Sequence, residues 1–340
     1  MEDVMKVGIN GFGRVGRQVL KALMERHPQY EVVQINDIAD TKTLAHLFKY
    51  DSTYGVYSQE VSSEDNTMTV GKNSISMTHF TDLNTIEWQK GIEVVIESTG
   101  IFTDRSKAAL HLKNDVQQVI ITAPSKNADC MIVLGVNDEL YDPSKHAVIS
   151  NASCTTNSLA PAVKLLNQRF KLLKGFMTTV HAYTSDQRIL DLPHKDLRRS
   201  RAAAVNIIPT STGAADAVGV VIPELKGLLT GISLRVPVAA VSVTDFVCSV
   251  EQSTSIQEVN DVFEQASRNS MKGILGFTTE PLVSSDFRRD SHSGIIDGLS
   301  TNVLDGNFIK ILSWYDNEWG YSCRVADLVH LIHQKKNGGS

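Results

Sequence analysis

A glycine pattern, Gly-x-Gly-x-x-Gly at residues 11–16, constrains the fold of this chain more than any other feature. The apolar residues 7–10 in front of it indicate a short strand, and Val15, Val19 and Leu23 behind it recur at the spacing of a helix face. Glycines in such a turn let the backbone approach a pyrophosphate, whose charge is stabilised by the helix N-terminus. The pattern therefore predicts a dinucleotide-binding α/β unit at the start of the chain.

The acidic residue Asp37 supports this interpretation. It comes just after a second apolar stretch, residues 32–35, and follows Gly16 by 21 positions. An acid at this distance accepts hydrogen bonds from the adenosine ribose, and its charge repels the 2′-phosphate of NADP. We therefore expect NAD as the cofactor. The alternative is a glycine-rich tight turn in some other α/β protein.

More apolar stretches in the first half predict further parallel strands that are buried on both faces, at residues 93–97, 119–121, 131–133 and 147–149. Small polar turns follow the first two. Ligands bind an open α/β sheet outside the carboxyl ends of its strands. Thr99, Gly100 and Thr122 in these turns are therefore candidate cofactor contacts, with ordinary loop chemistry as the alternative.

The second half of the chain has a different pattern. Alternation and β-branched side chains predict strands of a mixed or antiparallel sheet, at residues 176–180, 229–236, 241–250 and 306–314. Helical spacing recurs at 256–266 and over 321–334. The segment 182–206 is long, charged and without clear periodicity, which is typical of a functional loop or an interface; a solvated surface is the alternative.

Cys154 is the residue whose surroundings point most directly to chemistry. It lies among hydroxyl and amide side chains at 150–157, before Leu159, Val163 and Leu166 at helical spacing. A helix N-terminus lowers the pKa of a thiol, and hydroxyl donors there suit a phosphate. On these residues alone a second interpretation stays open, because free cysteines are usually small packing residues.

Length and composition limit the possible classes. A chain of 340 residues is long enough for a large core and favours two domains. The net charge of -5 gives no reason to expect a nucleic acid or an anionic membrane as the main partner. No apolar run reaches membrane-spanning length and no signal peptide is visible. The four cysteines are widely spaced, so we expect free thiols, no metal site and a cytoplasmic location.

Five segments of the chain closely resemble phosphorylating glyceraldehyde-3-phosphate dehydrogenase: residues 9–17, 150–157, 181–199, 209–215 and 313–322. They are spread over nearly the whole length. The resemblance implies an α/β fold in which a Rossmann NAD-binding domain, 1–153, is completed by a C-terminal helix at 318–340. An α+β catalytic domain with a mixed or antiparallel sheet would occupy 154–317. It also implies a homotetramer, with the loop at 182–206 near the cofactor site of a neighbouring subunit.

The resemblance also implies a role for each matching residue. Cys154 matches the nucleophile and His181 matches the acid or base that activates it. Thr184 and Arg235 match the site for the C3 phosphate of the substrate. Inorganic phosphate would be held by Ser153, Thr155, Arg199, Thr212 and Gly213. Cofactor contacts would come from Gly11, Phe12, Gly13, Arg14, Val15, Asp37 and Asn317.

The implied reaction is oxidation of glyceraldehyde 3-phosphate through a cysteine hemithioacetal and a thioester, which inorganic phosphate then cleaves. Two other functions stay open. One is an erythrose-4-phosphate dehydrogenase of the same family, since few pocket contacts set such specificity. The other is a non-catalytic binding protein on this fold, although neither the cysteine, the histidine nor the phosphate-site residues are lost.

Overall fold

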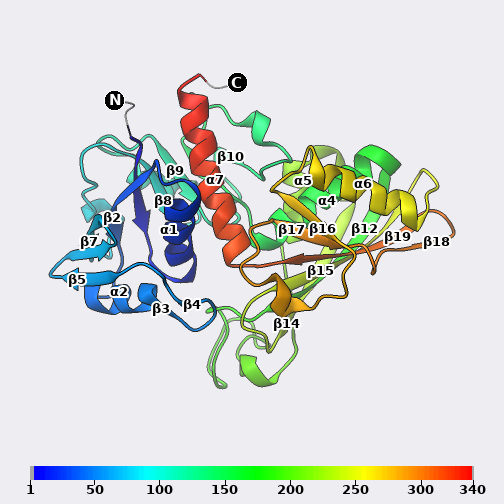
Figure 1. The fold of residues 1–340 in the computed structure, drawn as a ribbon, viewed down its shortest axis with the longest axis horizontal. Helices are drawn as coiled ribbons and strands as arrows, with labels where there is room; N and C mark the ends of the chain where they lie inside the picture. Colours follow the sequence, from blue (N-terminus) through cyan, green and yellow to red (C-terminus); the bar gives the residue numbers. More distant parts are fainter. Residues whose placement is uncertain (1–3, 339–340) are drawn as a thin grey trace. The chain divides into compact units, whose positions relative to one another are not determined.

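The computed structural model describes residues 4–338 and divides the chain into two compact units (Figure 1). Of the described residues, 4–132, 139–152 and 322–338 form the first unit, and 133–138 and 153–321 form the second. A 3₁₀ helix, η3 (Asp138–Leu140), and the last helix, α7 (Trp319–Lys336), each pass from one unit to the other. Among residues 4–338, no helix combines the length and the apolar character needed to cross a membrane.

The first unit is a Rossmann-type sheet of nine strands in the order β10-β11-β9-β8-β1-β2-β7-β6-β5. All neighbours are parallel from β10 to β7, and β5 and β6 extend the sheet as antiparallel strands. The elements of this unit are β1 (Lys6–Asn10), α1 (Arg14–Arg26), β2 (Glu31–Asn36), α2 (Thr41–Lys49), β3 (Tyr50–Asp51), β4 (Gly55–Val56), β5 (Val61–Glu64), β6 (Thr67–Val70), β7 (Asn73–Thr78), η1 (Leu83–Thr85), β8 (Ile92–Glu97), α3 (Arg105–Ala108), η2 (Ala109–His111), β9 (Gln118–Ile121), β10 (Cys130–Met131) and β11 (Val148–Ser150).

The expected strands of this half are confirmed, with one shortened. The sequence predicts a strand at 131–133, whereas β10 ends at Met131. The reason is local, because the backbone N–H of Val133 donates to the side-chain oxygen of Asn137 at 2.9 Å instead of to a neighbouring strand. The C-terminal part of α7 belongs to this unit, where Asp327 contacts His27 at 2.7 Å and His330 contacts the Tyr30 hydroxyl at 2.7 Å.

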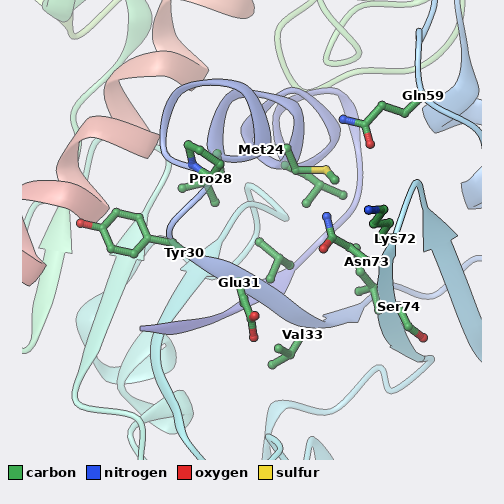
Figure 2. A pocket seen from close by; sticks show the side chains of 13 residues that line it. Met24, Pro28, Tyr30, Glu31, Val33, Gln59, Lys72, Asn73 and Ser74 are labelled. Carbon is green, nitrogen blue, oxygen red and sulfur yellow. The ribbon is translucent and has the colours of Figure 1, made fainter. Parts of the chain in front are cut away.

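The strand order places β1 between β2 and β8, so the direction of the connections reverses at β1. Cofactors bind at such a reversal, outside the carboxyl ends of the strands. A hollow of about 300 Å³ lies elsewhere in this unit, between α1 and the first residues of β2 and β7, and Figure 2 shows the side chains that line it. Because this hollow lies at the amino ends of those strands, it is not where the glycine turn would hold a dinucleotide.

The second unit is a mixed sheet of eight strands in the order β13-β14-β12-β15-β19-β17-β16, with β18 paired to β19. Most pairs are antiparallel, and β12/β14 and β16/β17 are parallel. Its elements are α4 (Cys154–Phe170), β12 (Leu172–Ala182), η4 (Ala203–Val205), β13 (Ile208–Ser211), α5 (Ala214–Val221), η5 (Pro223–Leu225), β14 (Leu229–Val236), β15 (Ser242–Val250), α6 (Ile256–Arg268), β16 (Leu275–Thr278), η6 (Ser284–Phe287), β17 (Gly294–Asp297), β18 (Asn302–Leu304) and β19 (Phe308–Tyr315).

Helix α4 contacts five strands of this sheet, β12, β15, β16, β17 and β19, and lies against α5 and α6. The predicted strands and helices of the second half are present, with their ends shifted by a few residues. The strand predicted at 241–250 begins one residue later, because Val241 has φ 70° and so leaves the extended conformation. The irregular segment predicted at 182–206 contains no helix or strand over residues 183–202.

Candidate active site

The glycine turn of the first unit is shaped by close backbone packing. Gly11 has φ 90°, and a Cβ atom on it would lie 2.6 Å from the backbone nitrogen of Thr99. A Cβ on Gly16 would lie 2.1 Å from the carbonyl oxygen of Gly11. By contrast, a Cβ on Gly13 would meet no atom within 4 Å, and Gly13 precedes α1 without a side-chain cap. The helix N-terminus beside Gly13, with Val15 half-buried in its first turn, therefore fits an approaching pyrophosphate.

Asp37 is held in place at the end of β2 by two backbone groups. Its carboxylate accepts hydrogen bonds from the N–H of Phe12 at 2.6 Å and of Ala39 at 3.0 Å. The contact with Phe12 joins the acid to the glycine turn. The side chain of Phe12 is fully buried, so Phe12 contributes only its backbone to the glycine turn. Arg14, predicted to contact the cofactor, forms an ion pair with Asp51 at 2.8 Å.

The predicted contacts at the ends of β8 and β9 converge on Glu97, which sequence reasoning treated only as a strand residue. Thr99 donates to the Glu97 carboxylate through both its backbone N–H and its hydroxyl. The backbone N–H of Thr122 donates to the Glu97 carbonyl at 3.0 Å, and Asn10 at the end of β1 donates to the carboxylate at 2.6 Å. Gly100 follows with φ 72° and space where a Cβ would lie. The buried Glu97 carboxylate thus joins the ends of β1 and β8, and the backbone carbonyl of the same residue holds the turn after β9.

In the second unit, Cys154 is the first residue of α4. Ser153 caps the helix, because its hydroxyl accepts a hydrogen bond from the Thr156 N–H at 3.0 Å. Ala152 in front of the cap has φ 55°. The Cys154 Sγ lies 3.5 Å from Nε2 of His181, which is the penultimate residue of β12. The structure therefore brings together the two residues that the sequence assigns to nucleophile and base.

The backbone of β12 determines which nitrogen of His181 faces the thiol. Nδ1 lies 2.7 Å from two groups with opposite demands, the carbonyl oxygen of Ala182, which only accepts, and Nη1 of Arg235, which only donates. We assign the hydrogen to Nδ1, because Nη1 has an acceptor of its own in the same carbonyl. Nε2 is then free to accept the thiol proton. Arg235 lies opposite His181 in the β12/β14 register. Its Nη1 donates to the same Ala182 carbonyl at 3.1 Å and lies 2.7 Å from Nδ1.

Burial controls the protonation of this pair. It raises the pKa of the Cys154 thiol, an effect that the Arg235 charge opposes. It also lowers the pKa of His181 to about 3, and the Arg235 charge adds to this lowering. The sequence-based expectation of a lowered thiol pKa is therefore wrong, because desolvation of Cys154, which the sequence does not reveal, outweighs the helix N-terminus. Transfer of the proton from Sγ to Nε2 leaves the net charge unchanged and places opposite charges side by side, so the pair ionises together more easily than either group alone.

A hydrogen-bonded network that sequence reasoning missed lies beside the thiol. The buried hydroxyl of Tyr315 contacts the hydroxyls of Thr155 and Thr179, each at 2.8 Å. The Tyr315 ring meets the His181 ring edge-on at 6.0 Å between centroids. Burial raises the pKa of Tyr315, so its phenol stays protonated. Thr155, predicted to bind phosphate, therefore has its hydroxyl engaged inside the protein.

Arg199 is tied to the irregular segment and still acts on the site. It forms an ion pair with Asp186, and its Nε donates to the Thr210 hydroxyl at 2.8 Å. Its charge also contributes to lowering the pKa of His181. Thr184 lies two residues beyond β12, with its N–H donating to Gln187 at 3.2 Å.

Thr212 and Gly213 form the entrance to α5. The Thr212 hydroxyl accepts from the Ala214 N–H at 3.2 Å, and Gly213 is the N-cap without a side-chain hydrogen bond. No hydrogen bond among residues 4–338 joins either of them to Cys154 or His181. Asn317 lies just after β19, where its Oδ1 accepts a hydrogen bond from Ser242 at 3.0 Å. The sequence did not reveal this contact, because Ser242 is only one polar residue within the strand predicted at 241–250.

Comparisons with known proteins cover both units. Residues 5–105 match a family model described as the NAD binding domain of glyceraldehyde 3-phosphate dehydrogenase, and residues 153–317 match the C-terminal domain of the same family.

Whole-chain relatives agree. The chain is 53% identical over 332 residues to glyceraldehyde-3-phosphate dehydrogenase of Geobacillus stearothermophilus, covering 97% of this chain and 99% of the relative. It is also 53% identical over 331 residues to glyceraldehyde-3-phosphate dehydrogenase 1 of Bacillus cereus, with the same coverage. The similarly named protein of Borreliella burgdorferi is 53% identical over 336 residues, which cover 96% of this chain and 99% of that protein.

Proposed function

The chain belongs to the glyceraldehyde-3-phosphate dehydrogenase family, and from this premise we propose that it oxidises D-glyceraldehyde 3-phosphate to 1,3-bisphosphoglycerate with NAD and inorganic phosphate. The observation that carries the proposal is the Cys154 thiol facing Nε2 of His181 at 3.5 Å. This pair supplies a nucleophile and a base at one point, which is what thiol attack on an aldehyde requires.

The thiol proton of Cys154 passes to Nε2 of His181, and the thiolate attacks the aldehyde carbon. The imidazolium then returns the proton to the carbonyl oxygen, which gives a hemithioacetal and leaves Nε2 free to accept again. Hydride loss from that carbon and proton loss from its hydroxyl give a thioester, with the proton taken up by the imidazole. NAD, when bound, supplies the hydride acceptor. A phosphate oxygen then attacks the thioester carbon, the C–S bond breaks, and the Cys154 thiolate leaves as an acyl phosphate is released.

Arg235 and Thr184 would hold the C3 phosphate of the substrate. Arg235 is half-buried and its guanidinium contacts the base directly, and its charge is one cause of the low His181 pKa. A substrate phosphate paired with Arg235 offsets this charge. The pKa of His181 then rises, so the imidazole holds the thiol proton better once substrate is present.

Inorganic phosphate would be held by two groups of donors. One group lies beside Cys154 in the sequence, and the other follows β13. Gly213 and Thr212 begin α5, whose N-terminus favours an anion, and Arg199 adds a positive charge. Ser153 and Thr155 flank the thiol in sequence. The hydroxyls of both residues already have partners inside the protein. We therefore propose that these residues bind phosphate through their backbone N–H groups, or after small rearrangements of their side chains.

The cofactor residues divide between the two units of the chain. The glycine turn with Asp37, and the ends of β8 and β9 with Thr99, Gly100 and Thr122, would hold the adenosine and pyrophosphate. Asn317 would hold the nicotinamide amide. In functional terms we assign NAD binding to residues 1–153 with 318–340 and chemistry to residues 154–317.

We also assign the protein to a homotetramer in the cytoplasm. Ile189, Leu197 and Val205 in or beside the irregular segment are 87%, 81% and 77% exposed. Large apolar side chains gathered on one exposed segment mark an interface, and a second copy of the chain is the expected partner. All four cysteines are free, which supports a reducing compartment. Sedimentation at micromolar protein concentration tests the assembly.

The test of the function is NADH formation from glyceraldehyde 3-phosphate, with and without inorganic phosphate. We expect turnover to depend on phosphate, and Cys154→Ser to lower it by about a thousandfold or more, because a hydroxyl is a far weaker nucleophile at neutral pH. NAD binding by the variant should be retained. Equal rates without phosphate, retained turnover in the variant, or faster oxidation of erythrose 4-phosphate would each contradict the proposal.

A further inference from the structure

A backbone outlier marks the place where β15 begins. Val241 has φ 70°, in the left-handed region that a β-branched residue rarely occupies. Such strained residues persist where the surrounding structure over-determines them, and they concentrate at functional sites. Val241 is followed by Ser242, the first residue of β15, which is 1% exposed.

The Ser242 hydroxyl is fully used. It accepts a hydrogen bond from the backbone N–H of Ala182 at 3.0 Å and lies 3.0 Å from Oδ1 of Asn317. Since the hydroxyl proton needs an acceptor in a buried site, it goes to Oδ1 and not to a donor. This settles which way the Asn317 amide faces, because Oδ1 points to Ser242 and Nδ2 points away from it.

We propose that Ser242 is a positioning residue that holds the Asn317 amide with Nδ2 presented as a donor to the carbonyl oxygen of the nicotinamide carboxamide. The inference rests on the proposed function, in which Asn317 holds that group. Among residues 4–338, Ser242 is the one side chain that hydrogen-bonds the Asn317 amide. Without the hydroxyl, the amide is free to turn over, and half of its orientations present an acceptor where a donor is needed.

The same hydroxyl links the base to the cofactor-holding residue. Ser242 contacts the N–H of Ala182, and the carbonyl of Ala182 accepts the Nδ1–H of His181. A single residue of β12 thus connects the serine to the imidazole that receives the proton. The position of the proton acceptor His181 is therefore coupled, through Ala182 and Ser242, to the position of the amide that would hold the nicotinamide carboxamide.

Two cofactors distinguish orientation of the amide from a general loss of packing. The carboxamide of NAD can pair with either end of an asparagine amide, since it has both a carbonyl and an NH₂ group. The analogue 3-acetylpyridine adenine dinucleotide keeps the carbonyl and lacks the NH₂ group, so it can pair only with Nδ2. A freely turning Asn317 therefore penalises the analogue more than NAD.

The experiment compares kcat/KM for the two cofactors in the full-length enzyme. We expect Ser242→Ala to lower the analogue-to-NAD ratio by about 3- to 10-fold, the range for loss of one neutral hydrogen bond. The matched control is Ser233→Ala, which removes a buried hydroxyl that has no partner among the described residues. This control should leave the ratio within twofold of the starting enzyme, and Ser242→Thr, which keeps the hydroxyl, should do the same.

A double-mutant cycle with Asn317→Ala completes the test, because Ser242→Ala should have no further effect on the ratio once the amide is gone. An unchanged ratio in Ser242→Ala, or an effect of that change that persists in the Asn317→Ala background, overturns the positioning role. An Asn317→Ala variant with unchanged kcat/KM for both cofactors refutes the assigned role of Asn317 itself. The two failures are therefore distinguishable, and thermal unfolding of each variant confirms that the fold is intact.

Discussion

The two units of this protein build their sites in different ways. In the NAD-binding unit the central feature is a continuous run, the glycine turn at 11–16, and its geometry depends on how closely backbones approach. In the catalytic unit the contacts join residues far apart in the chain, with 27 positions between Cys154 and His181 and 160 between Thr155 and Tyr315. Substitutions that add side-chain volume should therefore disturb the first site most. Substitutions that change which group carries a proton should disturb the second site most.

The largest effect should come from removing the base of the catalytic unit. We expect His181→Asn to lower kcat/KM by about 10²- to 10⁴-fold, the usual contribution of a general acid or base. The pH midpoint for alkylation of the Cys154 thiol should also rise. In the unmodified chain Nε2 accepts the proton, whereas in the variant burial, which raises the pKa of Cys154, acts without that acceptor. Iodoacetamide labelling followed across pH measures the midpoint.

Cys154→Ser is the control for this labelling. It reports the reaction of the other thiols, of which Cys248 and Cys323 are buried. Burial raises the pKa of the partly exposed Cys130 to about 12, so its background should be slow. A midpoint that is unchanged or lower in His181→Asn would show that the imidazole does not receive the thiol proton.

The difference between the units also explains what the sequence could predict. Rossmann topology follows from local patterns, since apolar strands, glycines and Asp37 stand in a recognisable order. The family roles of Cys154 and His181 follow from resemblance, and their 3.5 Å contact agrees with it. Tyr315 and Ser242 had no local signal, because their contacts depend on strand register. Nor could residue types alone show that desolvation opposes the helix N-terminus at the Cys154 thiol.

A smaller effect separates two glycines of the same turn. We expect Gly16→Ala to lower the free energy of unfolding by about 1–3 kcal/mol, as overpacking does, because the new Cβ would lie 2.1 Å from the Gly11 carbonyl oxygen. Gly13→Ala should leave stability within about 0.5 kcal/mol, because its φ of -69° suits alanine and the modest loss as an N-cap is offset in the unfolded chain. Urea denaturation measures both.

NAD affinity should follow a different order from stability. Gly13→Ala fills the one position of the turn that faces open space, so we expect its affinity for NAD to fall by about tenfold, or about 1.4 kcal/mol. Calorimetric titration with NAD measures it. Unchanged affinity in a stable Gly13→Ala variant would mean that the pyrophosphate does not approach the turn there.

The smallest expected change concerns the choice between cofactors. Asp37→Asn removes the charge that would repel a 2′-phosphate, so the ratio of kcat/KM for NADP to that for NAD should rise on the order of tenfold in low salt, and less as salt screens the charge. The side-chain oxygen of asparagine can keep one of the two backbone contacts, to Phe12 or to Ala39. Asp40→Asn is the matched control: it removes a nearby charge at the N-cap of α2, where asparagine caps equally well. If both variants shift the ratio equally, the discrimination comes from general charge around the site and not from the carboxylate that the glycine turn holds.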